Sequence, residues 1–560
     1  MKFYAAKLGP ILFFSLIITS VSAQTLPDSI IKKIDGLFAK WNNVNGPGCS
    51  IGIVRNDSLI FSKGFGMANL EYEIPITPAT IFYMCSVSKQ FTGYCIVLLA
   101  RQGKIKLDED IHVYLPWVAD FGKKITVRNL LNHTSGIRDD ITLAAIAGLG
   151  INGMLTQNLA LDILRRQHSL NFDPGEEYSY SNSNFVLLAE IIKAVSGKSF
   201  RAFADSAIFR RLGMPNTRFQ DDYVELIKNR AFSYERLDSN HYVNDFQNVY
   251  TLGDGGLFTN IIDMAKWVTN FYITKAGDSG DINQFTEKGK LNNDKVIDYA
   301  LGIVVDNYKG RKIYTHNGAL AGYRTAICVF PDLKMGFLVF SNVGDFLPDS
   351  KAFAIANLFV KDTMQRMKPK PEQKDSSAAI LKDTLSVQKF LGNYTSANDG
   401  QKSFEIRQGK LYNYDGNRIY VLIQTGKDSF SIFNRPEVKF IFSVTAKDTN
   451  LVITDPDRTY HFKKYKKIIP ASDQELKPYC GIYYSPELDC NYGLALKDHH
   501  LMLTNNKYPD KECTLTDQNN LTTGSWSMNH LTILRDNKNQ ITGFEINDRG
   551  IRHLKFNKIE

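Results

Sequence analysis

The pattern of apolar and polar positions predicts a mixed region of helices and strands in the first two thirds of the chain. After Asp28, apolar residues recur at helical spacing and predict a capped amphipathic helix. Two runs, 49–55 and 59–67, are separated by Asn-Asp-Ser and predict a β-hairpin. From Ser86 the pattern becomes helical, and Gly103 ends it. A helix, a hairpin and a second helix in this order indicate an α/β layered domain.

Helical patterns dominate the middle of this region. They extend over 104–248, whereas strand patterns return over 312–343 and a last helix is expected over 351–367. Sheet-forming segments at both ends, with helices between them, predict two lobes and a cleft between the lobes.

The last third of the chain has a different pattern. A Pro-rich, charged segment at 368–377 has nothing to bury and predicts a linker. The segments that start at Gly392 and Gly481 resemble each other and lie 89 residues apart, which indicates an internal repeat. Short alternating runs dominate each copy and predict antiparallel β barrels or sandwiches.

The first residues have the pattern of a secretory signal. Lys2 and Lys7 precede an apolar run at 11–18, and Val-Ser-Ala comes before Gln24. The alternative, a membrane anchor, needs about 18 to 20 apolar residues, and this run is shorter. No later apolar stretch is long enough to span a bilayer. We therefore expect an exported protein, periplasmic or secreted, with no transmembrane segment once the signal is removed.

Charge and cysteine content narrow the classes of partner. The net charge is +9, and loss of Lys2 and Lys7 with the signal leaves +7. Because the basic residues are scattered, the sequence does not favour nucleic-acid binding. The seven cysteines are an odd number, and one disulfide can form among Cys480, Cys490 and Cys513. The spacing of Cys and His does not favour a metal site, and no cofactor is expected.

The candidate chemistry begins at Ser86, in the motif Ser86-Val-Ser-Lys89. Ser86 lies in the first turn of a predicted helix, where free N–H groups and the helix dipole stabilise developing negative charge. Lys89 projects from the same face. It accepts the hydroxyl proton if burial lowers its pKa. This motif is common by chance, so its position carries the inference.

Two further motifs follow in order: Tyr180-Ser-Asn182 and His316-Asn-Gly318, which lie 94 and then 136 residues further on, counted from Ser86 to Tyr180 to His316. The alternative for Tyr180 and Asn182 is a helix-entry turn with a capping side chain, which the other motifs disfavour. Together, the three motifs resemble those of the serine β-lactamase, penicillin-binding-protein and D-aminopeptidase superfamily, in the D-aminopeptidase and esterase-like branch. Segments 125–136 and 255–267 also match, and the resemblance extends over about residues 28–366.

This resemblance implies a fold and a set of roles, and together with the residue patterns above it divides the chain. The fold is an α/β plus all-α β-lactamase/transpeptidase-like domain, followed here by all-β repeats. The expected boundaries are a signal peptide at 1–23, a serine hydrolase domain at 24–366, a linker at 367–384, and β-rich repeats at 385–469 and 470–560. The implied roles are Ser86 as nucleophile, Lys89 and Tyr180 in proton transfer, Asn182 in substrate binding, and the N–H groups of Ser86 and Ala319 as the oxyanion hole. Whether Lys89 or Tyr180 is the base stays open.

The sequence departs from the family where many relatives have Lys-Thr-Gly. His316 replaces the lysine and is neutral for much of its time above pH about 6.5. Asn317 removes a hydroxyl that helps to hold a substrate carboxylate, so penicillin turnover is less expected. Gly318, which completes the motif, is expected beside the substrate. Arg324 either restores carboxylate binding or is a surface strand residue.

Two other segments have competing interpretations. His133, in a His-Thr-Ser-Gly turn, is expected to belong to the scaffold. The apolar segment 141–151 lines an acyl pocket, forms a lid or is a core helix.

The expected function is hydrolysis of an amide or ester through an acyl-enzyme, with a D-amino-acid peptide or a small ester as substrate. The alternatives are a β-lactamase and a non-turnover sensor of cell-wall fragments. The expected partner is a small-molecule or peptide substrate, and the oligomeric state stays open.

Overall fold

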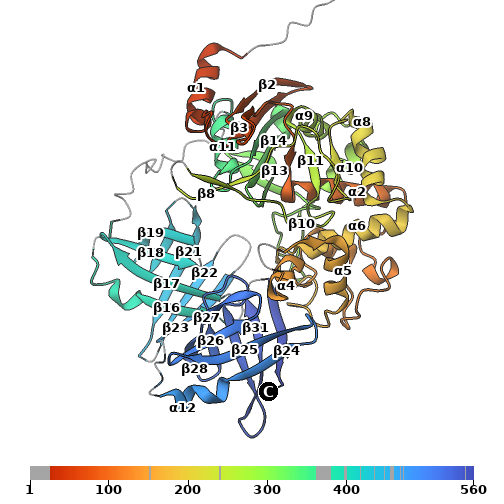
Figure 1. The fold of residues 1–560 in the computed structure, drawn as a ribbon. Helices are drawn as coiled ribbons and strands as arrows, with labels where there is room; N and C mark the ends of the chain where they lie inside the picture. The colour runs from red at the N-terminus through yellow and green to blue at the C-terminus, as the bar shows by residue number, and fades with distance from the viewer. Residues whose placement is uncertain are drawn as a thin grey trace, which may run out of the picture.

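The computed structural model describes residues 26–559 apart from 150–152, 239–240, 361–379, 382, 397–399, 416–417, 434, 447, 455–458, 467, 469, 471 and 549. The predicted signal peptide and linker segment 368–377 lie outside the described residues. In Figure 1 an α/β and helical part lies above two β modules.

A six-stranded antiparallel sheet forms the first layer, in the order β12-β13-β14-β15-β1-β2. Helices α1 and α11 cover one face of this sheet, and α9 covers the other. The central strands are therefore apolar on both faces, and all residues of β15 are buried. The bounds are β12 Val304–Tyr308, β13 Arg311–Leu320, β14 Tyr323–Phe330, β15 Met335–Ser341, β1 Cys49–Arg55, β2 Ser58–Phe65, α1 Asp28–Phe38, α9 Ile261–Asn270 and α11 Pro348–Ala356.

The helical lobe is built around α2 and α6, which pack against each other. Helix α2 is buried from Lys89 to Leu99, and it follows a short 3₁₀ turn, η2, that contains Ser86. The bounds are η2 Cys85–Ser88, α2 Lys89–Arg101, α3 Val127–Leu131, α4 Asp140–Ile146, α5 Gln157–Arg165, α6 Asn182–Ser196, α7 Phe200–Ala204, α8 Arg210–Leu212 and α10 Ser279–Phe285.

Short strands connect the two lobes. Their bounds are β3 Met67–Asn69, β4 Ile74–Pro75, β5 Phe82–Tyr83, β6 Leu155–Thr156, β7 Arg218–Phe219, β8 Tyr234–Arg236, β9 Tyr242–Asn244, β10 Val249–Tyr250 and β11 Leu257–Thr259. β11 pairs with β5, directly before η2, so the end of this small sheet fixes where Ser86 lies.

The first β module is a closed barrel of β16 to β23. Its interior is filled by aromatic rings, among them Phe390, Tyr394, Phe404 and Phe442. Its strands are β16 Gly392–Ser396, β17 Gly400–Arg407, β18 Lys410–Asp415, β19 Arg418–Gly426, β20 Ser429–Ile432, β21 Arg435–Val444, β22 Thr449–Thr454 and β23 Thr459–Tyr465.

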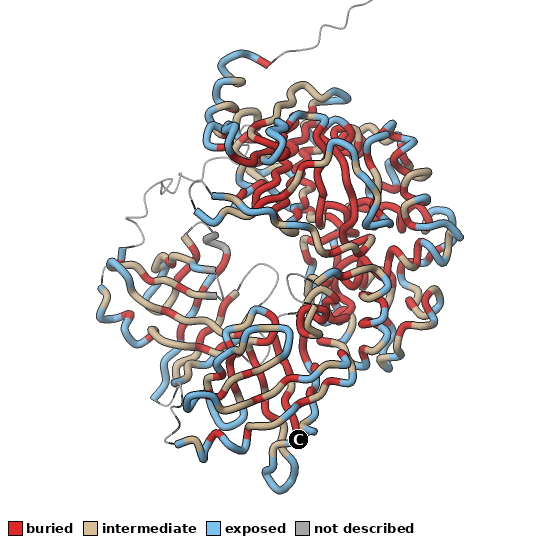
Figure 2. The backbone as a smooth tube through the Cα atoms, viewed as in Figure 1, coloured by how far each residue is buried: buried red, intermediate tan, exposed pale blue. Residues whose placement is uncertain are grey.

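The second β module is a nine-stranded antiparallel sheet. Its edge strands β27 and β28 are separated in the chain only by Cys513, so the sheet curls back on itself like a barrel. The strands are β24 Gly481–Ser485, β25 Cys490–Lys497, β26 His500–Asn505, β27 Tyr508–Glu512, β28 Thr514–Asp517, β29 Asn520–Thr522, β30 His530–Arg535, β31 Ile541–Asp548 and β32 Ile551–Lys558, preceded by α12 Asp473–Leu476. Figure 2 shows buried and exposed positions alternating along these strands.

The internal repeat is visible in equivalent hydrogen bonds. Tyr394, in the first strand of one module, donates to the carbonyl of Phe390 at 2.9 Å. Tyr483, 89 residues later, donates to the carbonyl of Tyr479 at 2.6 Å. The antiparallel, barrel-like architecture predicted for both copies is confirmed.

The second β module rests on helix α4. Tyr492 donates to the carbonyl of Ile146 at 2.8 Å, and Tyr508 donates to that of Ala145 at 2.5 Å. Leu143 and Ile146 are fully buried there. Apolar residues of α4 and of the second β module belong to one continuous core. The described part of the apolar segment 141–151 therefore packs as an interface helix.

Several sequence expectations are confirmed and others are corrected. The α/β and all-α fold class is confirmed. Helix α1 is not capped by Asp28, because Pro27 occupies the N-cap and Asp28 is the first helical residue. All seven cysteines are free, so the disulfide considered among Cys480, Cys490 and Cys513 is not formed. Within the described part of the chain, no helix is long and apolar enough to cross a bilayer.

Candidate active site

Ser86 lies in the tight turn that precedes α2. The residue before it, Cys85, has a φ of 50°, a left-handed backbone conformation that residues other than glycine rarely adopt. Ser86 is half-buried, while its neighbours Cys85 and Val87 are buried. The strained turn thus leaves the serine hydroxyl as the accessible group at the start of the helix.

Lys89 is the immediate partner of this serine. Its Nζ lies 3.2 Å from Ser86 Oγ, and it donates to Asn182 Oδ1 at 2.8 Å and to the carbonyl of Asp254 at 2.9 Å. The side chain is completely buried. Burial lowers the pKa of Lys89 to about 8, although Asp254, Asp139 and Asp140 act in the opposite direction. Near neutral pH a useful fraction of Lys89 is therefore unprotonated and able to accept a proton.

Tyr180 lies over the same lysine, with Lys89 Nζ 4.9 Å from its ring centroid. Its hydroxyl is buried and makes no hydrogen bond within ordinary limits of distance and angle. Burial raises the pKa of Tyr180, and the neighbouring Ser86 hydroxyl offsets this only in part. Tyr180 is thus a neutral phenol that can donate or relay a proton.

Asn182 is the first residue of α6 and links Lys89 to Asp139. Its backbone N–H and its Nδ2 both donate to Asp139 Oδ2, at 2.8 and 2.9 Å. The other oxygen of Asp139 accepts from the backbone N–H of Thr142 and caps α4. Asp139 therefore fixes the amide of Asn182, with its oxygen toward Lys89.

His316 lies on β13 and is held by hydrogen bonds at both ring nitrogens. Its Nδ1 donates to the carbonyl of Asn317 at 2.6 Å, so Nε2 accepts from the hydroxyl of Tyr299 at 2.9 Å. Burial lowers the pKa of His316 to about 4, and the charge of Lys89 acts in the same direction. The imidazole is neutral at physiological pH, and a substrate has to compete with Tyr299 for Nε2.

Gly318, the last residue of this motif, is required for a steric reason. A Cβ at Gly318 would lie 2.5 Å from the carbonyl of Met84 and 2.8 Å from Cβ of Cys85. Only glycine therefore lets β13 pass directly over the turn that carries Ser86.

The remaining two predicted site residues are Arg324 on β14 and Ala319 on β13. Arg324 pairs with Ala319, and its guanidinium donates to the carbonyls of Ala321 and Tyr323 at 2.6 and 2.7 Å. The next residue, Thr325, donates to the carbonyl of Met84. The carbonyl of Tyr323 also accepts from the Cys85 thiol at 3.9 Å, so the guanidinium of Arg324 lies beside the residue that precedes Ser86. Its role in carboxylate binding, and that of Ala319 in the oxyanion hole, stay predictions.

His133 packs against the ring of Tyr180 and is not exposed. Its ring is fully buried, with the ring of Tyr180 at 4.1 Å and that of Tyr299 at 4.7 Å between centroids. Its Nδ1 accepts from the backbone N–H of Ser181 at 3.2 Å. These contacts are those of a scaffold residue that supports the segment carrying Tyr180.

The structure adds residues that the sequence motifs did not indicate. Tyr299 comes from an irregular loop, and no local pattern marks it. Asp139 has a sequence signal, because an aspartate before an apolar run is typical of a helix N-cap. Asp254 contributes through its backbone carbonyl, which carries no sequence signal at all.

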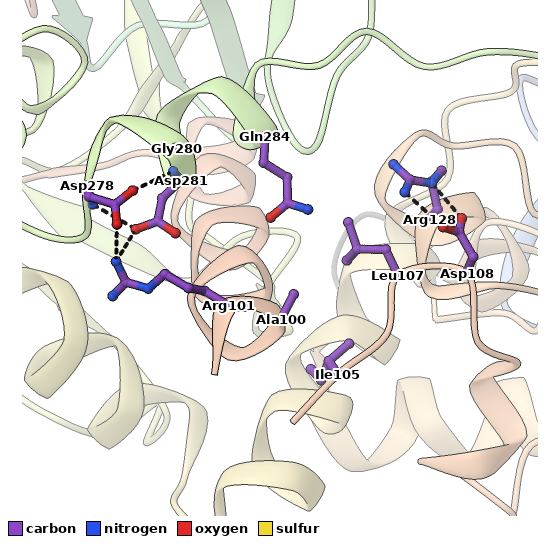
Figure 3. A pocket seen from close by; sticks show the side chains of 10 residues that line it. All are labelled: Ala100, Arg101, Ile105, Leu107, Asp108, Arg128, Asp278, Gly280, Asp281 and Gln284. Atoms are coloured by element: carbon purple, nitrogen blue, oxygen red, sulfur yellow. Dashed lines mark hydrogen bonds and ion pairs between the residues drawn. The ribbon is translucent and has the colours of Figure 1, made fainter. Parts of the chain in front are cut away.

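A depression lies at the other end of α2, away from Ser86. It has a volume of about 530 Å³ and is lined by Arg101, Asp278 and Asp281, with Asp108 and Arg128 on its far side. Figure 3 shows that its arginines point at neighbouring carboxylates. Arg101 lies 2.6 Å from Asp281, and Arg128 pairs with Asp108. Its charges are compensated within the depression.

The geometry defines a class of protein before any comparison. A serine at a helix start, a buried lysine one turn later, a neutral tyrosine and an asparagine are the parts of an enzyme that forms an acyl-serine intermediate. The chain belongs to the Beta-lactamase family, whose sequence profile matches residues 35–358. It is thus a member of a serine hydrolase family.

Individual relatives refine this placement. The chain is 30% identical over 280 residues to a D-aminopeptidase of Brucella anthropi and 29% identical over 301 residues to one of Brucella ovis. These matches cover 50% and 54% of this chain and 53% and 57% of the relatives, so the chain spans about half the length of the curated relatives it matches.

Solved structures support the fold. The octameric penicillin-binding protein homologue from Pyrococcus abyssi superposes with a TM-score of 0.55 at 23% identity, covering 78% of this chain and 99% of that one. This likeness concerns the fold alone.

Proposed function

We propose that the protein is an exported serine hydrolase that cleaves an amide bond next to a D-amino acid residue through an acyl-enzyme on Ser86. The observation that carries the proposal is the pair formed by Ser86 Oγ and the buried Nζ of Lys89, 3.2 Å apart. The lowered pKa of Lys89 suits a base near neutral pH. The similarity to D-aminopeptidases supports the substrate class.

The reaction follows from these positions. Neutral Lys89 takes the hydroxyl proton while Ser86 Oγ attacks the substrate carbonyl carbon. The carbon–nitrogen bond then breaks, and Tyr180 relays the proton held by Lys89 to the departing nitrogen, which leaves Lys89 neutral again. Water then attacks the ester carbonyl while Lys89 takes a proton from it. The ester bond breaks as that proton passes from Lys89 to Ser86 Oγ, which releases the acid product and restores the free serine. The Nδ2 of Asn182, which donates to Asp139 in the free enzyme, exchanges this partner for the substrate and donates a hydrogen bond to its acyl part.

The state of His316 supports a substrate without a carboxylate at this position. The imidazole is neutral and engaged by Tyr299, so it offers no positive charge to such a group. Penicillins and D,D-peptides carry that carboxylate, whereas a D-aminoacyl amide does not. We therefore rank D-aminoacyl amides above β-lactams.

The first experiment treats the mature protein with a fluorophosphonate and with a fluorescent penicillin and measures intact mass. We expect a fluorophosphonate adduct on the wild type and none on Ser86→Ala, with loss of at least about 10⁴-fold in turnover. An unlabelled wild type would favour a non-catalytic sensor, and turnover of nitrocefin would favour a β-lactamase.

The second experiment compares D- and L-aminoacyl p-nitroanilides with p-nitrophenyl esters on the same preparation. Faster cleavage of the D-aminoacyl series supports the proposal. Equal rates for both enantiomers, or cleavage of esters alone, would contradict it.

Export is a separate part of the proposal and rests on residues 1–23. Expression of the full chain in a Gram-negative host, followed by N-terminal sequencing of the periplasmic fraction, tests it. We expect the mature chain to begin at Gln24, and an uncleaved cytoplasmic product would contradict export.

A further inference from the structure

The turn between β31 and β32 of the second β module reaches the catalytic domain next to its active site. We call residues 550–552 the docking turn. Asn171 of the catalytic domain bonds to this turn twice, because its Nδ2 donates to the carbonyl of Gly550 at 2.9 Å and its Oδ1 accepts from the N–H of Arg552 at 2.7 Å. This pairing fixes the turn against the domain through its backbone.

The side chain of Arg552 reaches the segment that carries Tyr180. Its guanidinium donates to both oxygens of Glu177, at 3.2 and 3.1 Å. Only 5% of the Arg552 side chain is exposed, and 28% of that of Glu177. A bidentate pair with little exposure is more rigid than an ordinary surface ion pair. Glu177 lies three residues before Tyr180.

The same turn also contacts the network behind Lys89. The carbonyl of Gly550 accepts from the backbone N–H of Asp139 at 3.4 Å. Asp139 holds Asn182, and Asn182 holds Lys89 at 2.8 Å. Gly550 is thus connected to the base by a chain of contacts through Asp139 and Asn182.

A buried arginine strengthens this contact. Arg138 has no exposed side-chain surface, and it bonds to the carbonyl of Arg552 at 2.8 Å and to Glu487 at 2.6 Å. Both partners belong to the second β module. A buried guanidinium without these partners would be strongly unfavourable, so the docked arrangement is specified.

We propose that the docking turn positions the catalytic groups of the neighbouring domain, with Arg552 as a positioning residue. The docking turn holds the Tyr180–Asn182 segment through the ion pair between Arg552 and Glu177. Through the bond between Gly550 and Asp139, it also fixes the side-chain amide of Asn182, which orients Lys89. The second β module would then contribute to the reaction without touching the substrate. This inference rests on the proposed role of Ser86 as nucleophile.

The test measures the rate of fluorophosphonate labelling of Ser86 in the full-length protein, so that no substrate has to be known. In Arg552→Ala we expect the labelling rate constant per active site to fall about 10- to 100-fold, because small displacements of catalytic groups have large effects. The final extent of labelling should equal that of the wild type. The rising limb of the pH profile should move to higher pH, because loss of the guanidinium leaves the negative charge of Glu177 unpaired, and an uncompensated negative charge raises the pKa of a lysine.

Two further variants make the result specific. Arg535→Ala is the matched control, because Arg535 lies in the same module and its hydrogen bonds go to Asn519, Asn539 and Gln518 inside it. It should label like the wild type. Glu177→Gln keeps the size of the partner on a partly exposed site, and should lower the rate in the same direction even if Arg552→Ala folds poorly.

The outcomes separate positioning from stability. A lower extent of labelling with an unchanged rate constant per labelled site would overturn the proposal, since the module would then only stabilise the fold. Unchanged rate and extent in both Arg552→Ala and Glu177→Gln would also overturn it. An unlabelled wild type would instead contradict the proposed function itself.

Discussion

The two ends of helix α2 carry similar residues in opposite settings. At the first end Lys89 is completely buried, and its partners are an amide oxygen, a serine hydroxyl and a backbone carbonyl. At the last end Arg101 is 41% exposed and pairs with Asp278 and Asp281. The helix spans about 20 Å between them.

The difference shows what makes a cation reactive. Arg101 is compensated by two carboxylates and is partly exposed to water. Burial without a bonded carboxylate lowers the pKa of Lys89 to about 8. The functional end of the helix is the one where the charge is least well satisfied, which costs stability and provides a base.

Removing the charge at the buried end has the largest expected effect. Lys89→Met keeps the side chain long and apolar, and should lower kcat about 10²- to 10⁴-fold. The wild type should gain activity as the pH rises through about 8, because the unprotonated amine is the base. No inflection near 6.5 is expected, since His316 is already neutral there. The rate–pH profile of both proteins checks this, and a wild-type profile flat from pH 6 to 9 would exclude Lys89 as base.

A smaller effect is expected from changing the residue behind the buried end. Asp139→Asn keeps the shape but removes a negative charge that raises the pKa of Lys89. We expect about a tenfold loss in kcat, from poorer orientation of Asn182, and a shift of the rising limb to lower pH. The pH dependence of kcat measures both. A shift to higher pH would contradict this account of the electrostatics.

A second cation at the buried end should change specificity more than rate. His316→Lys places a positive charge near Lys89, which lowers the pKa of Lys89. The rising limb of the rate–pH profile therefore moves to lower pH. The variant should also bind carboxylate-bearing substrates more tightly, by about tenfold in KM. Tyr299→Phe is the control, because it releases Nε2 of His316 without adding charge. An unchanged profile in His316→Lys would show that residue 316 does not face the substrate.

The exposed end should respond least. Arg101→Ala removes two ion pairs and is expected to lower the free energy of unfolding by about 1 kcal/mol or less, with no change in kcat. Thermal unfolding and standard assays measure the two quantities. A large loss of activity would mean that the depression at this end takes part in function.

Much of the catalytic domain was predictable, because its signals are local. The strand predicted at 49–55 is β1 at Cys49–Arg55, and the helix predicted after Ser86 is α2. The motif residues Ser86, Lys89, Tyr180 and Asn182 lie together as the resemblance implied. Each motif sits at the start of a helix or on a central strand, where the backbone fixes the side chain.

The remaining features depend on contacts between distant segments. Tyr299 is recognised only by its bond to His316, and the docking turn only by its fit to Asn171 and Glu177. The state of the cysteines, for which the sequence allowed one disulfide, depends on such contacts too. Cys480 and Cys490 face the carbonyls of Leu476 and Ile146, and neighbouring positions in sequence do not reveal these directions.

The pair formed by Arg138 and Glu487 has a consequence for biogenesis. The two residues are separated by 349 positions, so Arg138 is synthesised long before the carboxylate that pairs with it in the docked protein. An unpaired charge in the interior is unfavourable. Since we propose that this docked module positions the catalytic groups, a protein truncated before residue 487 should lack a competent nucleophile at Ser86.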